Sequence, residues 1–243
     1  MLWHRALARG RHAALGPAAG AQSAGGVTFL LDVQPIGIIL AGGLARRLAG
    51  LDKGLIEIGG RPILGRLVER LAPQCAALVI NANGDAARFA SFGLPVVSDD
   101  IEGFAGPLAG LLAGMDYATA RFPSARDVLS VPADTPFIPE NLVARLGSAR
   151  AAGGARIAVA ASAGRAHHAV ALWPLALAED LRQALTAGER RVSSFIARYE
   201  NAAADWPAEP FDPFFNVNRP EDLAEAEALA RRADEQDLRG KRL

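Results

Sequence analysis

The chain contains a single cysteine, no long apolar run and no excess of charge of either sign. Because Cys75 has no second thiol as a partner, an internal disulfide is excluded, as are metal sites built on several thiolates. No stretch approaches the roughly 20 apolar residues that span a bilayer. The 26 basic and 26 acidic residues balance, so no net charge attracts nucleic acid or an anionic membrane. We therefore expect a cytoplasmic protein that binds neither of them.

The rest of the composition is typical of one globular enzyme domain. Hydrophobic residues make up 51% of the chain and charged residues 21%, and its length allows a full-sized core. Met1 to Gly26 differs, because it has three arginines, no acidic residue and many alanines and glycines. A transit peptide has a similar composition, but we interpret residues 1–35 as a disordered leader or as sequence upstream of the natural start. We expect the folded domain at 36–232 and a charged tail at 233–243.

Apolar runs alternate with helical periodicities through the first half of the chain. Short apolar runs that end in turn residues predict buried strands. Such strands are expected at 35–41, 77–81, 95–98, 127–131, 156–161 and 169–173. Apolar residues at helical spacing predict helices near 62–71, 86–92, 108–115, 139–150, 175–187, 192–199 and 220–232. The alternation predicts an α/β fold, with a doubly wound, mostly parallel sheet and helices on both faces.

The segment 37–54 combines several features of a phosphate-binding loop. It follows the first expected strand, where a doubly wound sheet binds its ligands. Gly42 and Gly43 allow the backbone to approach a base or a phosphate, and their N–H groups can form an anion-binding nest. Arg47 and Lys53 add positive charge to the same loop, which favours a triphosphate as its ligand.

Two common phosphate-binding motifs do not match this segment. The Walker A motif requires serine or threonine after its lysine, whereas Gly54 follows Lys53 here. The dinucleotide-binding fingerprint requires a third, spaced glycine, which residues 42–47 do not supply. On glycine content alone, a turn with solvated basic residues is an equally good interpretation.

Two polar residues stand where expected strands end. Asp134 comes shortly after the strand at 127–131, and a carboxylate there can hold Mg²⁺ against phosphates. A turn or helix-capping role explains the same aspartate from composition alone. Asn81 closes the strand at 77–81, and its amide can pair with a base or a ribose, or only terminate the strand.

Several ordered segments together resemble the molybdenum cofactor guanylyltransferase family. The resemblance runs from about residue 36 to 230. It is carried by the loop from Leu40-Ala41-Gly42-Gly43 to Lys53, Val79 to Asn83, Gly106 to Gly110, Pro132 to Pro136, Ala187 to Val192 and Phe215 to Pro220. It implies a Rossmann-like nucleotidyltransferase fold and transfer of GMP from GTP to the terminal phosphate of molybdopterin. Mg²⁺ is the implied cofactor, and molybdenum-insertion proteins and acceptor molybdoenzymes are implied partners.

The resemblance also assigns roles to residues. Those implied in catalysis are Lys53, Asp134 and Arg47, with Asp134 as the metal ligand. Those implied in nucleotide binding are Leu40, Ala41, Gly42, Gly43, Lys53, Asn81, Asp99 and Asp134. Those implied in acceptor binding are Gly106, Pro107, Leu108, Arg190, Arg191, Asn216 and Asn218. A helix start by Pro107, a charged helix entrance at 189–191 and turn-forming asparagines are the structural alternatives.

Two departures from the family pattern affect the loop and the acceptor side. Ala49 replaces a usual glycine, and Ala169 replaces a common proline after His167 and His168, which could line the acceptor side. No third ligand near these histidines supports a metal role. The alternatives are a CTP-dependent molybdopterin or sugar-phosphate nucleotidyltransferase, and a non-catalytic molybdopterin carrier. Related cytidylyltransferases show Ala-Ala-Gly where residues 41–43 are Ala-Gly-Gly here, which favours the guanylyl assignment.

Overall fold

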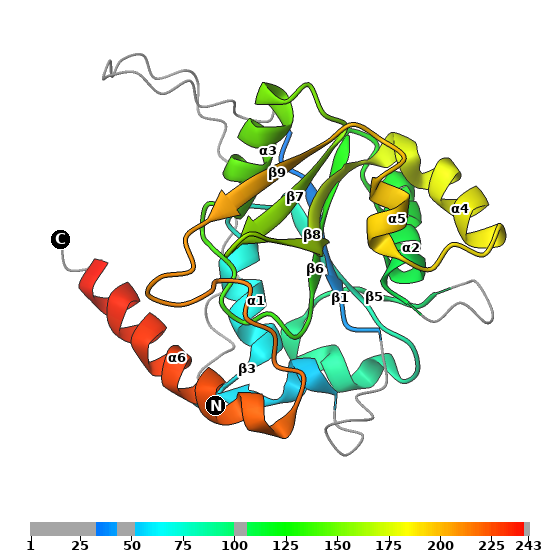
Figure 1. The fold of residues 1–243 in the computed structure, drawn as a ribbon. Helices are drawn as coiled ribbons and strands as arrows, with labels where there is room; N and C mark the ends of the chain where they lie inside the picture. Colours follow the sequence, from blue (N-terminus) through cyan, green and yellow to red (C-terminus); the bar gives the residue numbers. More distant parts are fainter. Residues whose placement is uncertain (1–32, 43–51, 100–105, 241–243) are drawn as a thin grey trace, which may run out of the picture.

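A computed structural model describes residues 33–42, 52–99 and 106–240. Its centre is a seven-stranded sheet with the order β5-β4-β1-β6-β8-β7-β9 (Figure 1). The strands are β1 Ile36–Leu40, β4 Ala77–Asn81, β5 Val96–Val97, β6 Asp127–Pro132, β7 Ile157–Ser162, β8 Arg165–Pro174 and β9 Asn201–Trp206. Strand β8 runs antiparallel to its neighbours β6 and β7, whereas the other neighbouring pairs are parallel. The expected α/β fold with a mostly parallel sheet is therefore confirmed.

Helices cover both faces of the sheet. Their bounds are α1 Ile63–Leu71, α2 Pro107–Arg121, α3 Leu142–Ala152, α4 Ala178–Thr186, α5 Val192–Ile196 and α6 Pro220–Gly240, with 3₁₀ turns η2 Lys53–Leu55, η3 Ala86–Phe92 and η4 Leu175–Leu177. One apolar core joins the sheet to α1, α3 and α6, and a second joins it to α2, α4 and α5 (Figure 1). The consecutive residues Ile38 and Ile39 of β1 belong to different cores, because side chains alternate along a strand. This double burial explains why β1 is a continuous apolar run.

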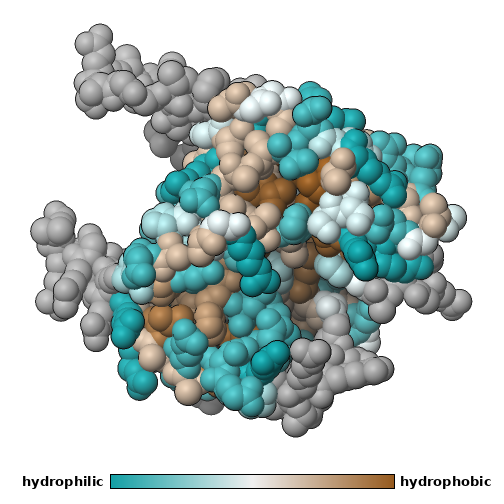
Figure 2. Space-filling view, viewed as in Figure 1, coloured by the Kyte–Doolittle hydropathy of each residue, from teal (hydrophilic) through white to brown (hydrophobic). Residues whose placement is uncertain are grey.

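The outer surface is more polar than these cores. In the view of Figure 2, hydrophilic residues cover most of the rim, and hydrophobic residues show mainly in hollows between the elements. None of the helices in the described part of the chain combines the length and apolar character needed to cross a membrane.

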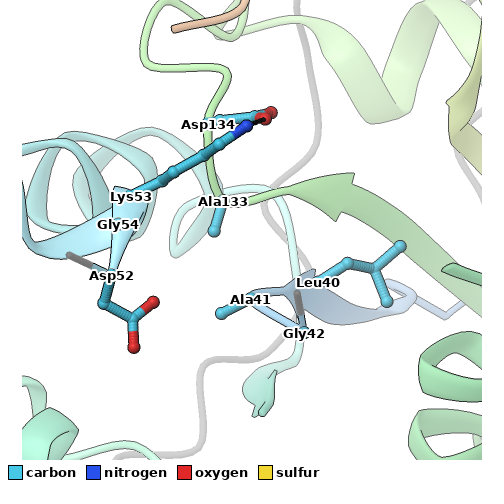
Figure 3. Close-up of a pocket in the computed structure, with 8 residues that line it drawn as sticks. All are labelled: Leu40, Ala41, Gly42, Asp52, Lys53, Gly54, Ala133 and Asp134. Carbon is cyan, nitrogen blue, oxygen red and sulfur yellow. Dashed lines mark hydrogen bonds and ion pairs between the residues drawn. The ribbon is translucent and has the colours of Figure 1, made fainter. Parts of the chain in front are cut away.

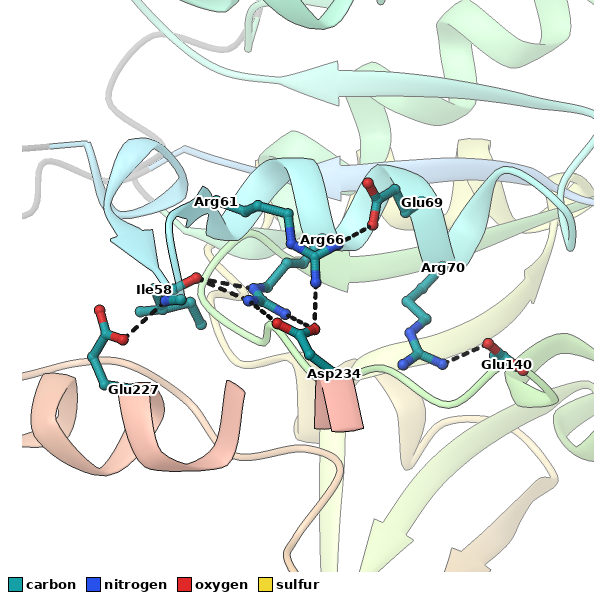
Figure 4. Close-up of polar contacts among 9 residues, drawn as sticks. Ile58, Arg61, Arg66, Glu69, Arg70, Glu140, Glu227 and Asp234 are labelled. Atoms are coloured by element: carbon teal, nitrogen blue, oxygen red, sulfur yellow. Dashed lines mark hydrogen bonds and ion pairs between the residues drawn. The ribbon is translucent and has the colours of Figure 1, made fainter. Parts of the chain in front are cut away.

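Helix α6 is anchored to the domain by a buried arginine (Figure 4). Arg66 of α1 is 5% exposed and donates hydrogen bonds to the Ile58 carbonyl and to both carboxylate oxygens of Asp234. A buried guanidinium requires such acceptors, since an unpaired charge in the interior is strongly destabilising. The sequence placed residues from 233 onward in a tail. Instead, α6 continues to Gly240, with Ala233 buried in the core and Asp234 paired.

Other differences concern short or alanine-rich elements. Strand β9 was not expected, because Asn-Ala-Ala-Ala-Asp-Trp has little apolar alternation. The small two-stranded sheet formed by β2 (Glu57–Ile58) and β3 (Arg61–Pro62) was not expected either. The helix expected at 86–92 is present, but as a 3₁₀ helix. The predicted leader lies almost wholly outside the described residues.

The close approach of α2 to β1 gives a stability prediction. A Cβ added at Gly114 would lie 2.5–2.8 Å from three side-chain carbons of Ile38. We expect Gly114→Ala to lower the free energy of unfolding by about 1–3 kcal/mol through overpacking, although alanine is the better helix former. Denaturation in urea, followed by circular dichroism, measures the change.

Gly65 of α1 supplies the matched control. A Cβ added there would meet Phe92 and Pro62 at 3.8 Å, an ordinary contact distance. Gly65→Ala should leave the free energy of unfolding unchanged or raise it by about 0.5–1 kcal/mol through helix propensity. Similar losses in both variants would show that close packing against Ile38 is not the cause.

Candidate functional site

A pocket lies where β1 and β6 end, at the edge of the sheet (Figure 3). Backbone hydrogen bonds continue past the strands here, from Ala41 N to the Asn81 carbonyl and from Ala133 N to the Leu40 carbonyl. The lining residues are Leu40, Ala41, Gly42, Asp52, Lys53, Gly54, Ala133 and Asp134. Five of the predicted site residues therefore share one cavity, at the strand ends where such folds bind ligands. Gly43 and Arg47 lie outside the described residues.

The ammonium group of Lys53 joins three distant segments. Its Nζ lies 3.0 Å from Asp134 Oδ2 and donates a 2.5 Å hydrogen bond to Asn218 Oδ1. Asn218 lies two residues before the start of α6, and its backbone N–H donates to Asp222 Oδ2 in the first turn of that helix. The Lys53 and Asp134 side chains are 25% and 17% exposed, so the pair remains accessible from the pocket. Cation and carboxylate are thus held together within reach of a ligand.

Asn216 reaches the same region through Thr135. The buried Thr135 hydroxyl donates to Asn216 Oδ1 over 3.0 Å, and Val217 N donates to the Asp134 carbonyl over 2.9 Å. Asn216 and Asn218 flank the buried Val217, so both amides lie beside residues 134–135 or Lys53. The structure therefore brings these two predicted acceptor residues next to the predicted catalytic pair.

Asn81 and Asp99 form a separate polar pair beside Gly42. Asn81 Nδ2 donates to Asp99 Oδ1 over 2.6 Å, and Asn83 Nδ2 donates to Asp99 Oδ2 over 3.1 Å. Asn81 is 2% exposed, and a Cβ added at Gly42 would lie 3.2 Å from its Oδ1. A Cβ added at Gly110 of α2 would lie only 2.0 Å from Asn81 Oδ1, so glycine is required there. The sequence offered no reason for Gly110 beyond its place in a family segment.

The other predicted acceptor residues do not line the pocket. Gly106 precedes α2 and Pro107 begins it, whereas the Leu108 side chain is 1% exposed and packs in the core. A Cβ on Gly106 would lie 3.9 Å from the Arg190 carbonyl, so these two segments are neighbours. The backbone N–H groups of Arg190 and Arg191 both donate to Glu189 Oε1. The start of α2 and a glutamate-capped turn thus lie together, and neither lines the pocket that contains Lys53.

Asp52 is a pocket residue to which the sequence analysis gave no role. Its Oδ2 accepts a 2.6 Å hydrogen bond from Arg88 Nε of η3, which fixes the residue just before Lys53. Arg88 is far away in the sequence and belongs to a short 3₁₀ helix, so no periodicity pointed to this contact. The only feature of the sequence that pointed to Asp52 was its position directly before Lys53.

Comparison with known proteins agrees with this geometry. Residues 37–203 match the MobA-like NTP transferase domain. A molybdenum cofactor guanylyltransferase of Rhodopseudomonas palustris (strain BisB5) is 59% identical over 196 residues, which cover 80% of this chain and 93% of the relative. The chain belongs to the molybdenum cofactor guanylyltransferase family. The resemblance noted from the sequence is thereby confirmed.

Another member of the molybdenum cofactor guanylyltransferase family matches the sequence, and a solved structure matches the fold. A guanylyltransferase of Bradyrhizobium sp. (strain ORS 278) is 55% identical over 199 residues, covering 82% of this chain and 94% of the relative. The molybdopterin-guanine dinucleotide biosynthesis protein A from Archaeoglobus fulgidus superposes with a TM-score of 0.64 at 21% identity, covering 81% of this chain and 99% of that one. This last match shows a shared fold.

A histidine lies at the same edge of the sheet, near the start of β8. His167 Nε2 is 2.7 Å from the buried Ser162 Oγ, and its ring centroid lies 4.8 Å from that of Phe214. Burial lowers the pKa of His167 below its ordinary value of 6.5; Asp212 opposes this shift, and Arg165 and His168 reinforce it. The neutral imidazole is therefore favoured in the folded protein.

The lowered pKa of His167 predicts a pH dependence of stability. Between the folded and unfolded pKa values the unfolded chain binds more protons, so this contribution is complete above pH 6.5 and is lost as the pH falls below it. We expect the melting temperature to fall more between about pH 7.5 and pH 5.5 in the wild type than in His167→Gln. The glutamine keeps an N–H donor for Ser162 but does not titrate. An equal fall of the melting temperature in both proteins would show that His167 is not the source of this pH dependence.

Proposed function

We propose that this protein transfers GMP from GTP to the terminal phosphate of molybdopterin, with or without bound molybdenum. The products are the guanine dinucleotide cofactor and pyrophosphate. The observation that carries the proposal is the contact of Lys53 with Asp134 and Asn218 at the strand ends, in a chain 59% identical to a named molybdenum cofactor guanylyltransferase. A nucleotide-binding cation, a carboxylate and an acceptor-side amide therefore lie at one point.

The guanine base is assigned to the space beside Gly42. The missing Cβ leaves room next to Asn81 Oδ1, and Asp99 adds carboxylate oxygens to the same polar pair. Guanine presents two adjacent N–H groups, which can donate hydrogen bonds to amide and carboxylate oxygens. A base without this donor pair could not form these hydrogen bonds, which opposes its binding.

The triphosphate is assigned to Lys53 and Asp134. The Lys53 ammonium is a mobile point charge that can leave its present partners for phosphate oxygens. Among the described residues no group of three or more histidines, cysteines and acids could hold a metal by itself. Mg²⁺ is commonly bound by one or two carboxylates together with substrate phosphates and water, so the single Asp134 fits this ion. When bound, Mg²⁺ would neutralise charge on the triphosphate and on the departing pyrophosphate.

The proposed reaction requires no proton transfer to or from the protein. The acceptor phosphate is already anionic, so its oxygen attacks the α-phosphorus without a general base. A bond forms between that oxygen and phosphorus, while the bond to the β-phosphate oxygen breaks and pyrophosphate leaves with the electron pair. Lys53 neutralises phosphate charge, and Asn216 and Asn218 hold the acceptor in line. Positioning and electrostatic stabilisation then account for catalysis.

We further propose a cytoplasmic location and two kinds of protein partner. A chain with a single, buried cysteine makes no use of an oxidising compartment. The substrate must be delivered by a molybdopterin-handling or molybdenum-insertion protein. The product must be received by molybdoenzymes that use the dinucleotide form.

Incubation with Mg²⁺, molybdopterin and each of GTP and CTP tests the proposed function. We expect turnover with GTP to exceed that with CTP by on the order of 10²-fold or more, because specificity comes from buried hydrogen-bonding groups. Mass spectrometry identifies the dinucleotide, and pyrophosphate release gives the rate. Equal turnover with both nucleotides would refute the guanylyl assignment, and molybdopterin binding without any product would indicate a carrier.

Substitution of Asp134 tests the role of its charge. Asp134→Asn keeps the shape of the side chain but removes the carboxylate, so we expect turnover to fall on the order of 10²-fold or more with molybdopterin binding little changed. The Lys53 ion pair is partly exposed, so its loss should cost only about 0–1 kcal/mol of stability. Steady-state kinetics at saturating GTP and the melting temperature are measured together.

Glu140→Gln is the matched control for this variant. Glu140 also pairs with a cation, Arg70, over 2.7 Å, but it is 74% exposed and does not line the pocket. The Glu140→Gln variant should therefore keep wild-type turnover. Normal turnover in Asp134→Asn would remove Asp134 from the mechanism, and a large drop in its melting temperature would point to a structural role.

A further inference from the structure

The loop 207–219 between β9 and α6 is tied to the end of β7 by one carboxylate. Asp212 Oδ1 accepts a 2.8 Å hydrogen bond from Ser162 Oγ and a 2.9 Å hydrogen bond from Phe214 N. Ser162 is the last residue of β7 and is fully buried. The loop is therefore fixed to the sheet edge well before it reaches Asn216 and Asn218.

The direction of each hydrogen bond at Ser162 follows from its single proton. Ser162 Oγ contacts both Asp212 Oδ1 and His167 Nε2, the latter over 2.7 Å. A carboxylate oxygen only accepts, so the serine hydroxyl donates to Asp212 and must accept from His167. His167 therefore carries its proton on Nε2. In this chain of hydrogen bonds His167 donates to Ser162, and Ser162 donates to Asp212 of the loop.

Apolar packing continues the anchorage from Asp212 toward the pocket. Phe214 is 2% exposed, and its ring lies 4.8 Å from that of His167 and 5.3 Å from that of Trp206. Val217 is fully buried, and its N–H donates to the Asp134 carbonyl. Residues 212–217 are thus held at both ends and in the middle.

We infer that Asp212, held by Ser162, is a positioning residue that presents Asn216 and Asn218 to the acceptor. This inference rests on the proposed function, in which these asparagines face molybdopterin. Residues 207–219 lie between a strand and a helix, so without an anchor they would lose more conformational entropy on binding. Displacements of the order of 1 Å are enough to impair an in-line reaction, which makes the anchor relevant to the chemistry.

Two variants that break the anchor and one that keeps it test the inference. Asp212→Ala and Ser162→Ala remove the hydrogen bond, so we expect the KM for molybdopterin to rise about tenfold while the KM for GTP changes less than about twofold. Asp212→Asn retains an oxygen that accepts from Ser162 and Phe214, and should restore a KM near that of the wild type. Rescue by the isosteric amide separates positioning from a need for charge.

Asp205→Ala is the control for removing an aspartate near this loop. Asp205 lies on β9 and is exposed. Its substitution by alanine should therefore leave the KM values for molybdopterin and GTP unchanged. Hydrogen exchange of the peptide that covers residues 212–219 gives a second readout that requires no substrate. We expect faster exchange there in Asp212→Ala, including the Val217 amide, and wild-type exchange in Asp212→Asn and in the central strands.

The outcomes separate this inference from the proposed function. An unchanged KM for molybdopterin in Asp212→Ala would overturn the inference, as would an equal rise in the KM for GTP. Unchanged exchange of residues 212–219 in that variant would overturn it too. A wild-type protein that forms no dinucleotide would refute the proposed function, and the exchange data alone would then decide whether Asp212 fixes the loop.

Discussion

The candidate site depends on the need of one ammonium group for acceptors. Lys53 Nζ lies between Asp134 Oδ2 and Asn218 Oδ1, and these three residues come from segments far apart in the sequence. Each acceptor replaces part of the hydration that this partly buried cation loses on folding. The same requirement suits a triphosphate, whose oxygens can replace both acceptors at once. The contacts that position Lys53 in the pocket are thus also the ones that a triphosphate would exchange.

The sheet provides the rigidity that this exchange requires. Strands β1 and β6 are covered on both faces, so their carboxyl ends are fixed points from which Ala41 and Ala133 extend. Around these fixed points the site is built on short connections: η2 carries Lys53, and the loop before α6 carries Asn218. A stable scaffold with adaptable connections is a common basis for catalysis and binding.

The sequence predicted the elements in which a local pattern and the tertiary environment agree. Strand β4 lies at the expected residues, because a run of buried apolar residues leaves little choice. Strand β9 was missed because its alanines carry weak periodicity and its pairing with β7 is decided by distant residues. Lys53 and Asp134 were predicted as site residues from family segments, whereas Asp212 and Ser162 depend on a contact that no local pattern contains. The contact between Arg66 and Asp234 was missed for the same reason, so the last helix was predicted to end too early.

Helix α6 has a consequence for how the enzyme is made. Its first turn follows Asn218, and its far part is held to α1 and β2 by Asp234 and by Glu227, which accepts from Gly59 N. A ribosome synthesises the amino-terminal strands first, whereas Asn218 follows Lys53 by 165 residues and Asp234 follows Arg66 by 168 residues. The Asn218 acceptor for Lys53 is therefore absent while the strands β1 to β9 are being synthesised. A nascent chain that ends before Asn218 contains Lys53 and Asp134 without this acceptor, so its site is incomplete.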